Sequence, residues 1–311
     1  MEGHCFVMIS VSFPVLYKNS IKYIRAPLKL KMWVKGEQTK LEIAAELLRL
    51  AVRHIGTDRK ILVCCDSWYP KGEVLKLQHI ENVEFICAVR TDTALYKIPD
   101  EPARKGPGRR RIYGERVSLE NFTLIDCSDG MRAGVMTVRT NLFRKTLVRA
   151  VKTVFSNGSK RLFLCTAPEE WLDDVDINIF SGDSRRWMEA DAALTPLSLY
   201  SLRWDIETSF YEMKKFWGLC SRLLRSRAGI ERILNLQAMV YSLPAVLPFT
   251  DSTFAGMAEY SIQERRFLIG RILQQEMFFT RLTGQPETDE NSRPLIRKLE
   301  LLLQETLQRA A

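Results

Sequence analysis

Histidine is scarce in this 311-residue sequence, and none of the seven cysteines forms a CxxC pair. The three histidines, His4, His54 and His79, follow no pattern and do not stand at zinc-ligand spacing from a cysteine. These absences exclude the common zinc-binding motifs. An odd number of cysteines placed in apolar runs indicates reduced, buried thiols, and not the disulfide framework of a small secreted protein.

Signals for secretion and for membrane insertion are also lacking. The apolar stretch at residues 5–16 has no basic region before it, contains Pro14 and alternates in the manner of a strand. No run approaches the ~20 apolar residues that a membrane-spanning helix needs. We therefore expect a cytoplasmic protein without a membrane partner.

What the sequence does have is an excess of positive charge and enough apolar residues for a sizeable core. Lysine and arginine number 46 against 37 acidic residues, which gives a net charge of +9. This balance favours a polyanionic partner without proving one. Hydrophobic residues make up 46% of the chain, as in ordinary globular proteins.

The first hundred residues predict an α/β fold. Two strands in the first 34 residues, separated by a basic turn, precede an amphipathic helix at residues 40–54 that Gly56 ends. An apolar strand at residues 61–65 runs into Asp66, and a short helix at 72–80 leads to a second buried strand at 83–90. Strand, helix and strand in this order predict a parallel pair.

The pattern changes after Pro99. A segment rich in proline, glycine and arginine is followed by several short strands that reach residue 166, the pattern of an antiparallel β insertion. Helices are then predicted at residues 196–216, 231–247, 261–282 and 294–309.

The most informative helix is the one predicted at residues 196–216. Arg203, Glu207 and Lys214 follow Tyr200 by three, seven and fourteen residues. At about 100° per residue, all four side chains project within an arc of about 60° on one face of a single helix. A carboxylate flanked by two cations and a phenol suits a site that holds a metal ion and nucleic-acid phosphates.

This spacing, Tyr-x2-Arg-x3-Glu-x6-Lys, resembles the YREK signature of a large group of DDE-type insertion-sequence transposases. Trp204 completes the Arg-Trp pair common in that group. The strand that ends in Asp66, the KGPGRRRIYGER segment and residues 218–244 resemble the same family, so the resemblance covers nearly the whole chain.

The resemblance implies an α/β fold with an RNase H-like core, a mixed sheet, a β-strand insertion and a helical C-terminal region. We accordingly expect the core to begin at 1–98, the insertion to span 99–190, the core helices with the YREK motif to span 191–250, and the helical region to span 251–311.

The resemblance also implies roles for particular residues. Asp66 and Glu207 would be catalytic carboxylates that hold Mg²⁺ (or Mn²⁺), with a two-metal site in intact relatives. The double-stranded DNA of the transposon ends would be bound by Tyr200, Arg203, Lys214, Trp204, Arg109, Arg110 and Arg111.

One family feature is not found. In the family a first catalytic Asp ends the first strand of the sheet, upstream of a strand like the one at residues 5–13. The acidic residues before Asp58 are Glu2, Glu37, Glu42 and Glu46, and none ends such a strand. We therefore expect an N-terminally truncated chain with impaired catalysis. Asp205 and Glu212 face away from Glu207 on the helix, which leaves Asp92 as the other carboxylate of interest.

Simpler interpretations remain open for each of these residues. Asp66 would also cap a turn, and Trp204 would also pack in a core. Glu207 and Lys214 would also suit a solvated helix face, and the arginines at 109–111 a solvated loop. Arg222, Arg225 and Arg227 suit either DNA contact or local ion pairs.

Three functions follow: an impaired, transposase-derived DNA-binding protein associated with the nucleoid; an active nuclease that recruits another carboxylate or whose missing segment is supplied from a different start site; or a non-enzymatic DNA-binding or inhibitory protein. The third would act as a homodimer or by pairing with full-length transposase.

Overall fold

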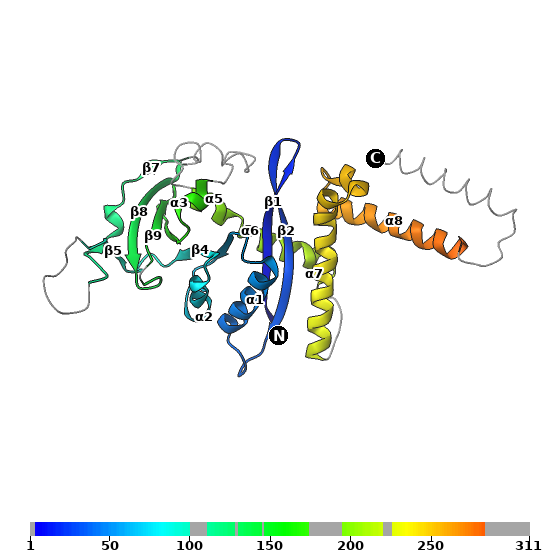
Figure 1. The fold of residues 1–311 in the computed structure, drawn as a ribbon, viewed down its shortest axis with the longest axis horizontal. Helices are drawn as coiled ribbons and strands as arrows, with labels where there is room; N and C mark the ends of the chain where they lie inside the picture. The colour runs from blue at the N-terminus through cyan, green and yellow to red at the C-terminus, as the bar shows by residue number, and fades with distance from the viewer. Residues whose placement is uncertain are drawn as a thin grey trace. The chain divides into compact units, whose positions relative to one another are not determined.

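The computed structural model describes residues 4–99, 111–127, 130–144, 146–173, 195–219 and 226–283 (Figure 1). The chain divides into two compact units, Met1–Val246 and Leu247–Ala311. Strands and helices are mixed throughout the first unit, which confirms the predicted α/β class with a mixed sheet.

The chain begins with a long hairpin of β1 (Cys5–Tyr17) and β2 (Ser20–Trp33), which pair antiparallel in a two-stranded sheet of their own. Lys18 and Asn19 connect them with φ values of 47° and 60°. Positive φ at both central residues is what a tight two-residue hairpin turn requires. The two predicted N-terminal strands are therefore confirmed, and the turn between them is limited to Lys18 and Asn19.

A second sheet of eight strands holds most of the first unit together. Its order is β3-β4-β10-β9-β8-β5-β6, with β7 paired to β8. The bounds are β3 (Ile61–Cys65), β4 (Val83–Val89), β5 (Leu95–Tyr96), β6 (Arg116–Val117), β7 (Ile125–Asp126), β8 (Arg132–Thr140), β9 (Val148–Val154) and β10 (Lys160–Cys165). The pair β3–β4 is parallel and the other pairs are antiparallel.

The parallel pair arises as the sequence predicted, because α2 (Gly72–Leu75) and the 3-10 helix η1 (Lys76–His79) carry the chain back between the two strands. The strands expected to form an insertion continue this sheet, since β10 pairs directly with β4. The short 3-10 helix η2 (Leu119–Asn121) and α3 (Glu169–Asp173) lie at its connections. The four-part division of the chain stays a prediction.

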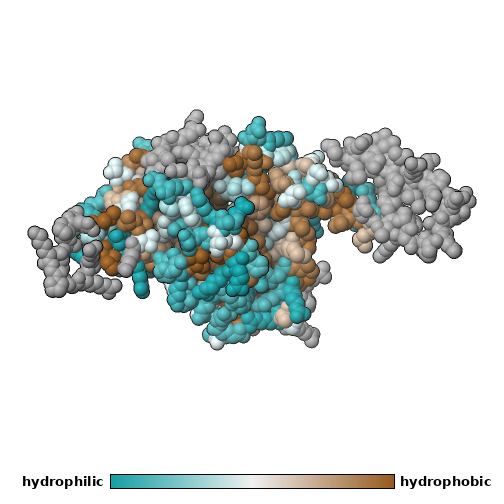
Figure 2. All heavy atoms as spheres, in the orientation of Figure 1, coloured by the Kyte–Doolittle hydropathy of each residue, from teal (hydrophilic) through white to brown (hydrophobic). Residues whose placement is uncertain are grey.

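Helices cover both faces of the eight-stranded sheet. On one face α1 (Lys40–Ile55) buries Ile43 and Leu47 in a core that includes Phe85 of β4. Thr39 begins α1 with a capping box to Glu42, and the outer face of α1 is hydrophilic (Figure 2). The other face carries a second core, to which α5 (Thr195–Ser201) contributes Leu197, Leu199 and Tyr200.

The prediction of a single helix at residues 196–216 was wrong. The helix α5 ends at Ser201, and α6 (Trp204–Phe216) follows after a tight turn. The N–H groups of Leu202 and Arg203 donate to carbonyls three residues earlier, those of Leu199 and Tyr200, at 3.1 and 3.0 Å. Such bonds tighten a helix locally. The turn lets α5 pack on the sheet while α6 packs on the hairpin.

The helix α7 (Arg227–Thr250) runs alongside β2 (Figure 1). The side-chain amide of Asn235 accepts from the N–H of Leu30 and donates to its carbonyl, both at 2.9 Å, and Glu231 accepts from the N–H of Met32 at 3.0 Å. Helix side chains therefore occupy hydrogen-bonding groups that an edge strand would otherwise expose.

By length and composition α7 could also cross a membrane. Its polar bonds to β2 are those of a helix packed within a protein. The second unit contains the 3-10 helix η6 (Ser252–Met257) and α8 (Ile262–Thr283). The helix predicted at 294–309 lies outside the described residues.

Candidate functional site

Asp66 follows β3 directly, at the end of a strand whose side chains are apolar. One carboxylate oxygen accepts from the backbone N–H of Trp68 at 2.9 Å, and the carbonyl of Asp66 accepts from the N–H of Tyr69 at 3.3 Å. The interpretation of Asp66 as a turn cap is therefore correct. The hydrogen bond from Trp68 uses one lone pair of the half-buried Asp66 carboxylate. The other lone pairs of this carboxylate can still accept from a further group.

Tyr200 lies close enough to Asp66 for the charge of Asp66 to affect the pKa of the phenol. The tyrosine is 9% exposed, and its ring meets that of Phe163 edge-on, with centroids 4.9 Å apart. Burial raises the pKa of Tyr200 to about 12, Arg203 opposes the rise, and the charges of Cys65 and Asp66 add to it. The phenol therefore stays protonated at neutral pH and can donate a hydrogen bond.

Arg203 connects Tyr200 to Glu207. Its guanidinium lies 5.6 Å from the ring centroid of Tyr200, and its Nη1 donates to Oε1 of Glu207 at 2.6 Å. Burial alone would lower the pKa of Arg203, but the hydrogen bond to Glu207 and the charges of Tyr200 and Glu207 outweigh it and raise the pKa.

Three of the four motif residues are thus in one place although the helix is interrupted. The backbone of Arg203 keeps helical dihedral angles, φ −56° and ψ −31°, within the turn. The side chains of Tyr200, Arg203 and Glu207 therefore still lie together across the turn. Lys214 is exposed on α6, seven residues beyond Glu207 and so about 10 Å further along the helix axis.

Trp204 is not a core residue, because 55% of its side chain is exposed. The guanidinium of Arg203 lies over its ring, 5.0 Å from the centroid. Tyr211, seven residues later, is 61% exposed. The open surface of α6 therefore carries aromatic rings beside Glu207, with Lys214 in its last turn.

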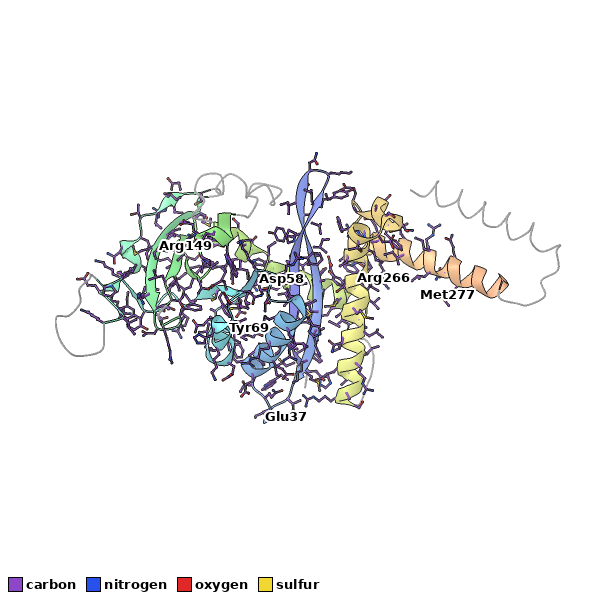
Figure 3. All side chains as sticks on the ribbon, viewed as in Figure 1. Glu37, Asp58, Tyr69, Arg149, Arg266 and Met277 are labelled. Carbon is purple, nitrogen blue, oxygen red and sulfur yellow. The ribbon has the colours of Figure 1, made fainter. Side chains whose placement is uncertain are left out.

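The predicted arginine loop is described only in part. Arg109 and Arg110 lie outside the described residues, whereas Arg111 is exposed. Arg222 and Arg225 are likewise outside the described residues. Arg227 forms ion pairs with Glu37 at 2.6 Å and with Glu231 at 3.4 Å, so local pairing is the correct interpretation for that arginine; Glu37 is labelled in Figure 3.

A polar cluster that the sequence did not reveal holds α6 against the hairpin. Arg25 of β2 pairs with Glu212 at 2.9 Å and with Asp205 at 3.8 Å, and Ser12 donates to Asp205 at 2.9 Å. The hydroxyl of Tyr241 on α7 donates to Glu212. No local pattern marks Arg25, because its partners lie about 190 residues away in sequence. Asp205 and Glu212 therefore contact the hairpin and α7, and not the face of α6 that carries Glu207.

The pKa values of the residues in this cluster are shifted for different reasons. Burial raises the pKa of Asp205, and its bonds to Ser12 and Arg25 only partly oppose that rise. Burial would lower the pKa of Arg25, but Tyr241, Glu212 and Asp205 together raise it. Several anions and acceptors surround one arginine, whereas Asp205 has one longer ion pair. Burial also raises the pKa of Tyr241 to about 12.

The donor chemistry of Asp66 and Glu207 fits a hard divalent cation, because carboxylate oxygens are the ligands that Mg²⁺ prefers. In the ranges that the structure describes, no group of three or more histidine, cysteine, aspartate and glutamate side chains is arranged to hold a metal. Asp92 is exposed and pairs with Arg90 at 2.8 Å.

Comparison with known protein families decides the class. The family model for the transposase DDE domain matches residues 30–243, which include Asp66 and the whole motif from Tyr200 to Lys214. The chain belongs to the transposase DDE domain family. No curated protein matches its sequence. Domains of this family act on DNA and generally use divalent metal ions, and its members are generally soluble cytoplasmic proteins.

Proposed function

We propose that the chain is a DNA-binding protein of the DDE insertion-sequence transposase type, with an RNase H-like core and the YREK motif. Asp66 and Glu207 are its catalytic carboxylates. The observation that carries this assignment is the linked set Asp66, Tyr200, Arg203 and Glu207, in which charge and contact connect the end of β3 to α6. DNA of the transposon ends is the proposed partner, and the nucleoid the proposed location.

Each side chain has a distinct task in this proposal. Asp66 and Glu207 hold Mg²⁺ or Mn²⁺, which when bound activates a nucleophilic oxygen and stabilises the leaving oxygen of a phosphodiester. Arg203 orients the carboxylate of Glu207 through their hydrogen bond. The protonated phenol of Tyr200 and the ammonium of Lys214 bind phosphate oxygens.

DNA contacts outside the motif complete the proposed interface. Trp204 stacks on a base, as its exposure on α6 permits. The arginines at 109, 110 and 111 contact the phosphate backbone.

The number of carboxylate ligands limits the activity that we propose. Two Mg²⁺ ions need enough oxygen ligands to hold both, and the described residues bring no third acidic side chain into a metal-binding group with Asp66 and Glu207. With only two carboxylates, Asp66 and Glu207 would hold one ion weakly. We therefore propose that cleavage and strand transfer are impaired in this chain, and that a further carboxylate is needed to restore them.

A second candidate function is that of a non-enzymatic partner of full-length transposase, and the surface of α7 favours it. Leu236, Met239, Val240 and Leu243 are each 43–55% exposed and recur at helical spacing. A continuous apolar stripe of this kind suits another helix, from a second copy or from an intact relative. Recovery of a stable complex with full-length transposase that Leu243→Glu disrupts would favour this function.

Salt-dependent DNA binding tests the main proposal. Replacing Arg109, Arg110 and Arg111 by alanine should weaken binding to duplex DNA and flatten the slope of log K against log salt by up to about 0.9 for each phosphate that the loop no longer neutralises. Triple alanine replacement of three exposed cations elsewhere is the matched control. It uses Arg53, Arg59 and Lys76, and it should change the slope less. Equal effects of the two triple variants on the slope would show that the arginine loop is a solvated segment that does not contact DNA.

A further inference from the structure

Four side chains, among them that of Trp68 two residues after Asp66, form a second surface feature, which we call the indole–lysine cluster: Trp33 at the end of β2, Lys40 at the start of α1, and Trp68 and Lys71 in the loop after β3. The Nζ of Lys71 lies 4.8 Å from the ring centroid of Trp68. The Nζ of Lys40 lies 4.9 Å from the ring of Trp33 and 6.0 Å from that of Trp68.

Both lysines of this cluster face aromatic rings. In the described part of the chain neither Lys40 nor Lys71 forms an ion pair, and both ammonium groups lie over indole rings. Neighbouring acids are already paired, Glu73 with Lys76 and Arg49, for example. Two available ammonium groups therefore stand over an aromatic surface.

Trp68 is both exposed and fixed in place. Its side chain is 43% exposed, although an indole of this size would normally be buried where a fold allows it. Its ring meets that of Tyr69 edge-on, with centroids 5.2 Å apart, and Tyr69, which is labelled in Figure 3, packs against the core to which α1 contributes. Its backbone N–H donates to the carboxylate of Asp66 at 2.9 Å. The turn that Asp66 caps therefore also contains Trp68.

We propose that the indole–lysine cluster is a binding site for an unpaired nucleotide of a DNA strand. The base stacks on Trp68, and Lys40 and Lys71 move from the rings to the flanking phosphates. Exposed aromatic rings interleaved with cations are how proteins bind single-stranded nucleic acid without reading its sequence. The inference rests on the proposed function, and it assigns the substrate an unstacked nucleotide next to Asp66.

The chain contains a matched control for this site. Lys60 and Trp171 form the same kind of pair, with the Nζ of Lys60 5.9 Å from the ring centroid. Lys60 directly precedes β3, whereas Asp66 directly follows it, so this pair lies at the opposite end of the same strand. Its replacement removes an equal charge without touching the proposed site.

The test uses the full chain and DNA duplexes with or without a short single-stranded tail that carries 2-aminopurine. Stacking on an indole should quench the fluorescence of the analogue. Wild-type protein should prefer the tailed duplex. Trp68→Ala should weaken binding of the tailed duplex by roughly 5- to 100-fold, abolish the quenching and leave binding of the blunt duplex unchanged.

Three further variants sharpen the result. Trp68→Phe should retain part of the preference, Lys71→Ala should weaken binding of the tailed duplex, and Lys60→Ala should behave as wild type. Unchanged binding of the tailed duplex by Trp68→Ala overturns the inference, as does an equal loss on both duplexes. If wild-type protein binds DNA in a salt-sensitive manner but does not prefer the tailed duplex, this inference is overturned and the proposed function stands. Absence of any DNA binding by wild-type protein overturns the proposed function as well.

Discussion

Replacing Arg25 by alanine should remove the side chain that ties α6 to the hairpin. Arg25 lies 2.9 Å from Glu212 and 3.8 Å from Asp205, and the three side chains are 27%, 17% and 24% exposed. Breaking a buried ion pair by removing one partner costs about 3–5 kcal/mol, whereas a fully exposed pair contributes about 0–1 kcal/mol. At roughly a quarter exposure we expect Arg25→Ala to cost about 2–3 kcal/mol of unfolding free energy.

Urea unfolding at neutral pH, with the midpoint and the slope both fitted, measures this cost. The control is Arg59→Ala, because Arg59 pairs with Asp58 at 3.4 Å but the two side chains are 74% and 77% exposed. That variant should lie within about 0.5 kcal/mol of wild type.

A double-mutant cycle with Glu212→Gln isolates the pair. The coupling energy between Arg25 and Glu212 should be at least about 1 kcal/mol, because the two side chains are in direct contact. A cost for Arg25→Ala no larger than that of Arg59→Ala, or two effects that simply add, would refute the reasoning.

Two further predictions concern pH and activity. Burial raises the folded-state pKa of Asp205 above its ordinary value of 3.8, so the stability that this group contributes is fully present below pH 3.8 and is lost as the pH rises through the folded-state pKa. Wild type should therefore lose stability relative to Asp205→Asn across that window, and a constant difference in unfolding free energy would contradict the assignment. In the second prediction, the purified chain with Mg²⁺ or Mn²⁺ and its own transposon ends should show no cleavage above background, because a poorly positioned nucleophile costs about 10²-fold or more in rate. Robust nicking that Glu207→Gln abolishes would show that another acidic residue completes the site.

The features that the sequence predicted correctly depend on local patterns. The apolar run before Asp66 and the run at β4 needed only hydrophobic content and a short intervening helix to predict a parallel pair. The spacing from Tyr200 to Glu207 predicted neighbouring side chains, and the contacts of Arg203 with both confirm it.

The features that the sequence did not predict depend on tertiary packing. The turn at Leu202 and Arg203 forms because α5 packs on the eight-stranded sheet and α6 on the hairpin, two surfaces that no window of sequence reveals. Trp204, the first residue of α6 after that turn, is 55% exposed. The pairing of β10 with β4 joins strands about 75 residues apart, which is beyond the reach of periodicity.

Metal binding tests the central assignment most directly, since it asks whether Asp66 and Glu207 act together. Electron paramagnetic resonance titration of Mn²⁺ should show one weak site in the wild-type chain, and Asp66→Asn and Glu207→Gln should each weaken it by roughly 10-fold or more. Asp92→Asn, which removes an exposed carboxylate paired with Arg90, should leave the affinity unchanged. Wild-type affinity in either the Asp66 or the Glu207 variant would contradict a shared metal site.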